Sequence, residues 1–342
     1  MKVSVIVPVY NVEEFVLGCL ESINNQSFKD YEVIVVNDCS TDGSLQIVKE
    51  YVGVHPHFQL IDLPQNGGVM HAWMEGVKHA SGDYLFFVDS DDTVPEDALD
   101  TLVNIVHKYD VDIACGNSSY DTRRYGGGLS YHDNYIKAGL YAGEKVKEIQ
   151  KAVFPTIKQH YFSPARWAKL FKKDLLVENL KYCDTSITSG DDVNIVLPCM
   201  MSAKSVYFID KPVYYYLQRP NSISRAFNNK ILGTYDTLIS KIAEAVADKH
   251  AGYLQEELNS LYSYYAISWC IYVVNSNLSS KDKKKEINRL FDKQYQFVKV
   301  SMKDLCSNWL VNLYVLTVMF KSPSLFLKGW NGKKKIKKLL KR

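Results

Sequence analysis

Short apolar runs alternate with longer amphipathic segments through the first third of the chain. Residues 3–9 and 31–38 are almost wholly apolar, as expected of strands buried on both faces. Between them, apolar residues recur at helical spacing over residues 12–27. The alternation continues with strands expected at residues 58–63, 84–92 and 111–117 and helices at residues 40–52, 67–82 and 95–109. This order predicts an α/β fold built on a parallel sheet.

The pattern changes after about residue 225. Three later segments have helical character: residues 231–250, 254–274 and 281–305. Proline, which would interrupt such helices, is absent from Asn221 to Lys321. We therefore expect three parts: an α/β domain over residues 1–225, a helical C-terminal region over residues 226–320, and a basic amphipathic tail over residues 321–342.

Composition is typical of a soluble protein with a substantial core, because 46% of the residues are hydrophobic and 23% are charged. The seven cysteines are scattered without a C-x-x-C pair, which argues against a zinc site and for reduced thiols. The N-terminus begins a strand at once and lacks the features of a secretory signal peptide. We expect a cytoplasmic protein.

The net charge of +3 conceals an asymmetry. Residues 321–342 contain nine of the 41 Lys and Arg residues, so the other residues hold 32 basic against 38 acidic side chains. Apolar and aromatic residues lie among these charges: Leu325, Phe326, Leu327 and Trp330. This combination favours an anionic membrane surface, here the inner face of the plasma membrane, and we expect no nucleic-acid partner.

Two alternatives exist for this basic tail, namely a disordered solubilising segment and a nucleic-acid-binding arm. The apolar run before it, residues 309–320, is too short to span a bilayer. We therefore expect the protein to be peripheral at the membrane.

Polar side chains follow the ends of three expected strands, at Tyr10, Asp38 and Asp89–Asp92. The carboxyl ends of parallel strands meet at one edge of a sheet, where ligands of α/β proteins bind. Asp89, Asp91 and Asp92 place three carboxylates in four positions, which a divalent cation would stabilise. The alternative is that Asp91 or Asp92 caps the next helix, and Asp38 is equally consistent with a helix N-terminal acid.

A second acidic pair, Asp191 and Asp192, precedes another apolar run. A carboxylate at a helix start can act as a general base, and Gly190 would give the backbone its freedom there. The alternative is an ordinary helix N-cap. The loop after the first strand contains no glycine, so the chain lacks the G-x-G-x-x-G fingerprint of dinucleotide binding.

Five segments in order resemble the family-2 inverting glycosyltransferases of the GT-A fold, of the bacterial capsule, teichoic acid and exopolysaccharide type. They are VSVIVPVYN, SINNQSFKDYEVIVVND with STD, NGG, SGDYLFFVDSDD and GDDVN, and the resemblance covers roughly residues 1–225. It implies a nucleotide-sugar-binding domain, a UDP-sugar donor, Mn²⁺ or Mg²⁺, and a glycan or lipid-linked oligosaccharide acceptor. The implied enzyme is a hexosyl- or N-acetylhexosaminyltransferase of cell-surface polysaccharide synthesis.

The resemblance also implies roles for single residues. Asp192 matches the catalytic base and Asp191 the acid before it; Asp91 is the first choice as metal ligand, followed by Asp89 and Asp92. The implied donor-binding residues lie at the ends of the first four expected strands and in the loops after them. They are Pro8, Val9, Tyr10, Asn11, Asp38, Asn66, Gly68, Asp89, Ser90 and Asp91.

Two later segments complete the implied site. Trp167 and Lys169 match a segment beside the acceptor, although residues 166–176 equally fit an amphipathic helix. Arg219, with Ser222 and Arg225, would close on the donor diphosphate.

The chain departs from the family pattern at three places. Asn37 replaces the first of two acids, and Asp191 is one methylene shorter than the usual Glu. The helix after NGG usually carries Ala-Arg-Asn, whereas here it reads Ala72, Trp73, Met74, which removes a planar cation. The alternative for Trp73 is that it simply packs into the core.

Two other functions are consistent with these residues. One is a non-catalytic glycan- or membrane-binding protein that retains the fold. The other is a nucleotidyltransferase, which also uses strand-end acids and a metal but normally needs a basic, glycine-rich phosphate loop that this sequence lacks near its first strand. A metal-dependent inverting glycosyltransferase is the main expectation.

Overall fold

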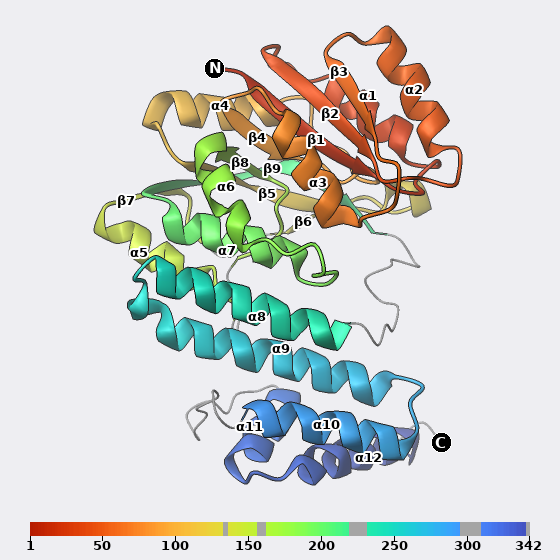
Figure 1. The fold of residues 1–342 in the computed structure, drawn as a ribbon, viewed down its shortest axis with the longest axis vertical. Coiled ribbons are helices and arrows are strands. Elements are labelled where there is room, and N and C mark those ends of the chain that lie inside the picture. The colour runs from red at the N-terminus through yellow and green to blue at the C-terminus, as the bar shows by residue number, and fades with distance from the viewer. Residues whose placement is uncertain (133–135, 156–161, 219–230, 295–308, 340–342) are drawn as a thin grey trace. The chain divides into compact units, whose positions relative to one another are not determined.

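The computed structural model describes residues 1–132, 136–155, 162–218, 231–294 and 309–339, which fall into two compact units (Figure 1). The first unit takes most of residues 1–250, past the boundary expected at residue 225, and the second consists mainly of residues 251–342. The first unit extends this far because its last helix is tied to it: Tyr182 Oη donates to Asp248 at 3.3 Å, and Lys249 contacts Ser202.

The first unit is built on one mixed sheet with the order β3-β2-β1-β4-β8-β5-β9-β7, with β6 beside β5. Its strands are β1 Val3–Val9, β2 Tyr31–Asn37, β3 Phe58–Asp62, β4 Tyr84–Phe87, β5 Ile113–Asp121, β6 Leu129–His132, β7 Gly139–Ala142, β8 Lys169–Lys172 and β9 Ser205–Leu217. The expected parallel sheet is confirmed for β1–β4, where Val3 pairs with both Tyr31 and Tyr84.

Three strands that the sequence did not predict, β6, β7 and β8, run antiparallel to their neighbours and make the sheet mixed. The four-residue strand β8 lies between β4 and β5, so it separates the parallel strands β1–β4 from the parallel pair β5 and β9. The segment 166–176, for which an amphipathic helix was the alternative, divides between β8 and the following helix.

Helices cover both faces of this sheet (Figure 1). In the first unit they are α1 Val16–Asn24, α2 Ser44–Val54, α3 Val69–His79, α4 Ala98–Tyr109, α5 Glu144–Ala152, α6 Lys173–Asn179, α7 Asp191–Ser202 and α8 Ile231–Asp248. The second unit contains α9 Gln255–Asn275, α10 Ser280–Gln294, α11 Trp309–Met319 and α12 Pro323–Leu339. Within the described ranges, every helix is too short or too polar to cross a membrane.

Alternate residues of β1 supply the cores on the two faces of the sheet. Val3, Val5 and Val7 belong to the buried cluster that includes the apolar sides of α1 and α4. Ile6 faces α3, where a Cβ at Gly76 would lie 2.5 Å from Ile6 Cγ2, so only glycine permits this close approach. Trp73 of α3 is fully buried against Phe87, which places it in the core.

Glu32, near the start of β2, holds together three segments at the amino ends of the parallel strands. Its carboxylate accepts hydrogen bonds from Lys2 Nζ at 2.7 Å, Ser4 Oγ at 2.6 Å and the Ser81 N–H at 2.6 Å. Partial burial raises the pKa of this carboxyl, but the hydrogen bonds from Lys2, Ser4 and Ser81 outweigh it and lower the pKa from 4.5 to about 2.

We expect Glu32→Gln to lower the free energy of unfolding at pH 7 by about 1–2 kcal/mol, less than the pKa shift alone implies because the side chain is partly exposed. The ionised carboxylate stabilises the fold above pH 4.5, and this stabilisation is lost as the pH falls toward 2. Urea unfolding at a series of pH values should therefore show the wild-type advantage shrinking on acidification.

Glu96→Gln is the matched control, because Glu96 is exposed and its side chain has no hydrogen bond within the described residues. It should leave unfolding nearly unchanged across the same pH range. The lowered pKa would be contradicted if the difference in free energy of unfolding between the wild type and Glu32→Gln stayed constant down to the lowest pH at which the protein folds.

Candidate active site

A cavity of about 550 Å³ opens at the carboxyl ends of β1, β2 and β4. Its walls are the loops after these strands, the start of α3, the loop before β8 and the segment leading into α7. Eleven of the residues expected from the sequence line it: Pro8, Val9, Tyr10, Asp38, Asn66, Gly68, Asp89, Ser90, Asp91, Asp191 and Asp192. The strand-end loops and the helix-start acids therefore form one site.

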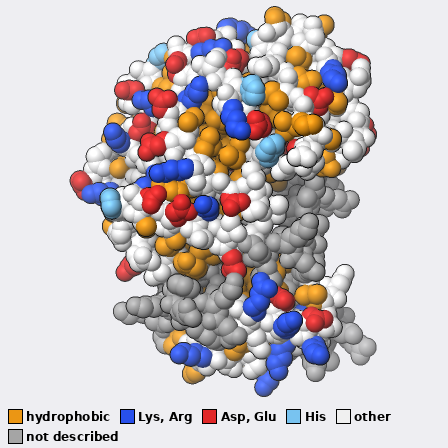
Figure 2. Space-filling model, in the orientation of Figure 1, with side chains coloured by type: hydrophobic (Ala, Val, Ile, Leu, Met, Phe, Trp, Pro, Cys, Tyr) orange, Lys and Arg blue, Asp and Glu red, His pale blue; other side chains and the backbone are white. Residues whose placement is uncertain are grey.

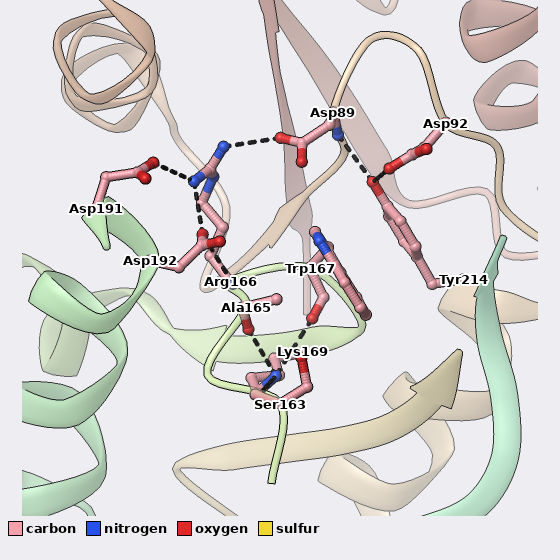
Figure 3. Close-up of polar contacts among 10 residues, drawn as sticks. All are labelled: Asp89, Asp92, Ser163, Ala165, Arg166, Trp167, Lys169, Asp191, Asp192 and Tyr214. Carbon is pink, nitrogen blue, oxygen red and sulfur yellow. Dashed lines mark hydrogen bonds and ion pairs between the residues drawn. The ribbon is translucent and has the colours of Figure 1, made fainter. Parts of the chain in front are cut away.

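The side chain of Arg166 connects both groups of acids (Figure 3). Its Nη2 donates to Asp89 Oδ1 at 2.7 Å, and its Nη1 donates to Asp191 Oδ2 at 2.9 Å and to Asp192 Oδ1 at 2.6 Å. The Arg166 backbone N–H also donates to Asp192 Oδ1, at 3.1 Å. One buried guanidinium thus holds the carboxylates of the β4 loop and of the α7 start in a fixed arrangement.

Burial and charge act against each other in this cluster. Burial lowers the pKa of a guanidinium, but Asp192, Asp89 and Asp191 hold the pKa of Arg166 well above its ordinary value. Burial raises the pKa of Asp89 to about 6, although Arg166 opposes the change. Burial, followed by the neighbouring Asp192, also raises the pKa of Asp191. The carboxylates are therefore crowded enough that further positive charge in the cavity would stabilise them.

The start of α7 fixes the two acids expected to include a catalytic base. Gly190 precedes the helix with φ +83°, a conformation that glycine adopts without strain. Asp191 and Asp192 are then the first two helical residues, where the helix dipole favours negative charge. Arg166 holds Oδ1 of Asp192, and no described residue donates a hydrogen bond to its Oδ2. A carboxylate with one fixed oxygen and one open oxygen can accept a proton from a ligand in the cavity.

Asp38 shapes the opposite side of the cavity. Its Oδ1 accepts the Gly67 N–H and its Oδ2 accepts the Gly68 N–H, both at 2.8 Å. Asn66 Nδ2 donates to the Asp38 backbone oxygen at 3.1 Å, and Gly68 has φ +87°. Asp38 therefore binds the N-terminal end of α3 and sets the turn that carries Asn66 into the lining.

Two expected donor-site positions serve the loops instead. Asn11 does not line the cavity, because its Oδ1 accepts the Thr41 N–H at 2.8 Å and joins the loops after β1 and β2. Asn37, which replaces the first of two acids in the family pattern, donates from Nδ2 to Asp62 at 2.7 Å and is fully buried. Asn11 therefore positions the loop that presents Tyr10, whereas Asn37 joins the ends of β2 and β3.

Asp92 does not line the cavity, and its carboxylate points to the Tyr214 hydroxyl (Figure 3). Its Oδ2 accepts the Tyr214 hydroxyl at 2.7 Å and its Oδ1 accepts the Leu217 N–H at 2.7 Å. The Tyr214 oxygen in turn accepts the Asp89 N–H at 3.0 Å. Burial raises the pKa of Asp92 well above its ordinary value, and the nearby Asp91 and Asp89 raise it further. This geometry gives Asp92 a structural role in fixing the loop after β4.

Lys169 and Trp167 support the loop that carries Arg166 and do not line the cavity. Lys169 is buried, and its Nζ donates to the backbone oxygens of Ser163 at 3.0 Å and Ala165 at 2.6 Å. Burial lowers the pKa of this ammonium to about 8. Trp167 stacks on Tyr214 with ring centroids 4.8 Å apart. Arg219, Ser222 and Arg225, expected to close on the diphosphate, lie outside the described residues.

Sequence reasoning assigned no role to Arg166 itself. One indirect signal could have identified it. Because α3 lacks the arginine of the family pattern, the acids expected at the site had no positively charged partner assigned to them. Other cavity-lining residues were also missed, namely Val69, Met70, Ala72, Thr185, Ile187 and Thr188. These side chains are apolar or neutral and carried no charge or motif by which to recognise them.

Residues 4–168 match the sequence family described as glycosyl transferase family 2. Glycosyltransferase GlyA of Streptococcus pneumoniae is 34% identical over 233 residues, which are 67% of this chain and 32% of GlyA. Poly(ribitol-phosphate) beta-glucosyltransferase of Bacillus spizizenii is 30% identical over 249 residues, which are 71% of this chain and 37% of that protein. The chain spans about a third of the length of both relatives.

Among solved structures, Staphylococcus aureus TarS 1-349 in complex with UDP-GlcNAc has the same fold. It aligns with a TM-score of 0.68 at 22% identity, covering 95% of this chain and 89% of that one. This likeness confirms the GT-A fold class expected from the sequence, with its helical C-terminal region.

We expect Tyr214→Phe to lower the free energy of unfolding by about 1–3 kcal/mol, because the buried Asp92 Oδ2 and the Asp89 N–H both lose their partner. Urea unfolding followed by tryptophan fluorescence measures this, since Trp167 stacks on the same ring. Tyr215→Phe is the matched control, because within the described residues the Tyr215 hydroxyl makes no hydrogen bond. Equal stability of the two variants would show that the Tyr214 hydroxyl does not hold this loop.

Proposed function

The chain belongs to glycosyl transferase family 2, and on that premise we propose that it is an inverting enzyme that transfers a sugar from a UDP-sugar to a hydroxyl of a glycan. The observation that carries this proposal is the common cavity of Asp38, Asp89, Asp91 and Asp192. The proposed donor-binding residues and a carboxylate able to accept a proton line one space of about 550 Å³, which suits a small molecule.

Asp192 is the proposed general base. An acceptor hydroxyl would attack the anomeric carbon, forming the new C–O bond while the bond from that carbon to the diphosphate oxygen breaks. The open Oδ2 of Asp192 would take the hydroxyl proton, and the UDP would leave with the bonding electrons. Attack on the face opposite the leaving group inverts the anomeric centre. Arg166 keeps the carboxylate oriented through Oδ1 during this step.

The nucleoside end of the donor is proposed to bind beside Tyr10 and Asp38. Tyr10 is largely exposed at the mouth of the cavity, where its ring can stack on a base. The carboxylate of Asp38 lies in the lining and can accept a further hydrogen bond from a uracil N–H. The complex of S. aureus TarS with UDP-GlcNAc, a protein of the same fold, supports a UDP-sugar as the donor class.

Asp91 and Asp89 are the proposed ligands of Mn²⁺ or Mg²⁺. In the described part of the chain no three His, Cys, Asp or Glu side chains are arranged to enclose a metal. The two acids fit the other common arrangement, in which one or two carboxylates share the cation with substrate phosphates. A bound cation would offset the charge of the departing diphosphate. Asp92 is not part of this proposal, because Tyr214 and Leu217 occupy its oxygens.

The acceptor is proposed to be a growing bacterial surface glycan. The relative from Bacillus spizizenii is named for glucosyl transfer to poly(ribitol phosphate), which supports a surface polymer as the acceptor class. The loop with Thr185, Ile187 and Thr188 lines the cavity beside Asp192, so an acceptor hydroxyl that reaches this base would pass these side chains.

Features of the second unit support a peripheral association with an anionic membrane. Lys and Arg side chains gather over α10 in Figure 2, where Lys281, Lys284 and Lys285 are exposed. Phe320, between α11 and α12, is 68% exposed and is followed by the exposed Lys321. Exposed aromatic and basic residues together favour anionic lipid surfaces.

We expect Asp192→Asn to reduce UDP release from the preferred UDP-sugar by about 100-fold or more, because the proposed base can no longer accept a proton. A panel of UDP-sugars assayed with Mn²⁺ identifies the donor, and calorimetry checks that the variant still binds UDP. Asp100→Asn, in the first turn of α4 and outside the cavity lining, is the matched control and should keep wild-type turnover.

Undiminished turnover in Asp192→Asn with UDP bound would exclude Asp192 as the base. Failure of the wild type to bind UDP with either metal would exclude the donor class, and other nucleotide sugars would then be tested.

We expect the full-length chain to cosediment with vesicles that contain anionic lipid, and to do so less as salt is raised. Phe320→Ser should weaken this binding because it removes an exposed aromatic anchor. Val54→Ser is the control, since Val54 is 74% exposed but lies on α2 of the first unit. Equal binding to zwitterionic and anionic vesicles, or none at low salt, would contradict the membrane proposal.

A further inference from the structure

We propose that Arg166 serves as the resident cation of the ligand-free site. Its guanidinium pairs with carboxylates that would otherwise bind a divalent metal. The metal then binds firmly only together with the donor diphosphate. This inference rests on the proposed function of the cavity. It assigns to Arg166 a role that the sequence motifs did not suggest.

The contacts of the guanidinium are the first support. Arg166 engages one oxygen each of Asp89, Asp191 and Asp192, at 2.7, 2.9 and 2.6 Å. Asp89 is one of the two acids proposed to hold the metal. A cation approaching Asp89 in the empty site therefore meets a carboxylate that is already paired, and it is repelled by the positive charge beside it.

The second support is that Arg166 is fixed in place. The residue is only 4% exposed, and its loop is held by Lys169, whose Nζ binds backbone oxygens of Ser163 and Ala165. The backbone oxygen of Ala168 accepts the Gly116 N–H at 2.9 Å, which ties the loop to β5. The backbone around Arg166 is therefore held in place, and the buried guanidinium is kept against the carboxylates by its own three hydrogen bonds.

The balance of charge is the third support. Asp89, Asp91, Asp191 and Asp192 line the cavity, and among its described lining residues Arg166 supplies the positive side chain. Without Arg166 the four carboxylates would leave a strongly negative cavity that attracts a free divalent cation. With it, the attraction for a free cation falls, whereas the attraction for a diphosphate rises.

The unused donor of the guanidinium is consistent with this role. Arg166 Nε is buried and has no hydrogen-bond partner within the described residues. A buried donor without a partner costs free energy, so the guanidinium has hydrogen-bonding capacity that its three carboxylate partners leave unused. The arginine therefore favours a ligand that brings negative charge together with the metal.

The test is a titration with Mn²⁺, using the paramagnetic resonance signal of the free ion as the readout, with and without UDP. For the wild type we expect UDP to tighten Mn²⁺ binding about tenfold or more. For Arg166→Gln we expect Mn²⁺ alone to bind about tenfold more tightly than to the wild type, because a positive charge near the metal is removed. Simple structural damage would instead weaken metal binding.

Arg123→Gln is the matched control, since Arg123 pairs with Asp121 outside the cavity lining, and it should match the wild type. Unchanged Mn²⁺ affinity in a folded Arg166→Gln variant would overturn the inference. If that variant does not fold, the wild-type titrations decide: equal Mn²⁺ affinity with and without UDP also overturns it. Absence of UDP binding under all conditions would instead show that the proposed donor is wrong.

Discussion

Repulsion among carboxylates at one edge of the sheet is the constraint on which the arrangement of this site depends. The fold brings Asp38, Asp89, Asp91, Asp191 and Asp192 to a single cavity, where burial strengthens every interaction between charges. Different donors stabilise different acids. Backbone amides of a glycine turn bind Asp38, and the guanidinium of Arg166 binds Asp89, Asp191 and Asp192. The acids can therefore stay close together before any ligand arrives.

The loop before β8 supplies most of this stabilisation. Successive residues take separate tasks, because Arg166 enters the cavity while Trp167 packs on Tyr214 and Lys169 binds the loop's own backbone oxygens. The ring of Tyr214 then connects this packing to its hydroxyl, which bridges Asp92 and the backbone of Asp89. The loop that carries the cation and the loop that carries the acids are thus positioned by one aromatic side chain.

The sequence predicted much of this site because its main signals are local. Apolar runs identified β1, β2 and β4, and since parallel strands end at one edge, Tyr10, Asp38, Asp89 and Asp91 were expected to meet. The convergence of Asp192 with them followed only from the family resemblance. The antiparallel strand β8 was missed because its four residues, two apolar side chains between two lysines, also fit a helix.

The side-chain roles that the sequence could not give depend on distant partners. Asp92 looks like its neighbours Asp89 and Asp91 in the sequence, and only the position of Tyr214, more than a hundred residues later, makes it structural. Lys169 resembled a ligand-binding cation in the sequence, yet its ammonium donates hydrogen bonds to three backbone oxygens. Arg166 lies far along the chain from Asp89, so no spacing rule links them.

The bridge made by Tyr214 also bears on how such a protein can diverge. Positions 92, 167 and 214 share one buried hydrogen bond and one stacked pair, so a change at any of them alone leaves a polar group unsatisfied or a ring unsupported. Mutations there would show strong epistasis. Thr185, Ile187 and Thr188 face the same cavity without carrying the charges that hold it together. Substrate preference is therefore free to drift through that loop while the charged framework stays constant.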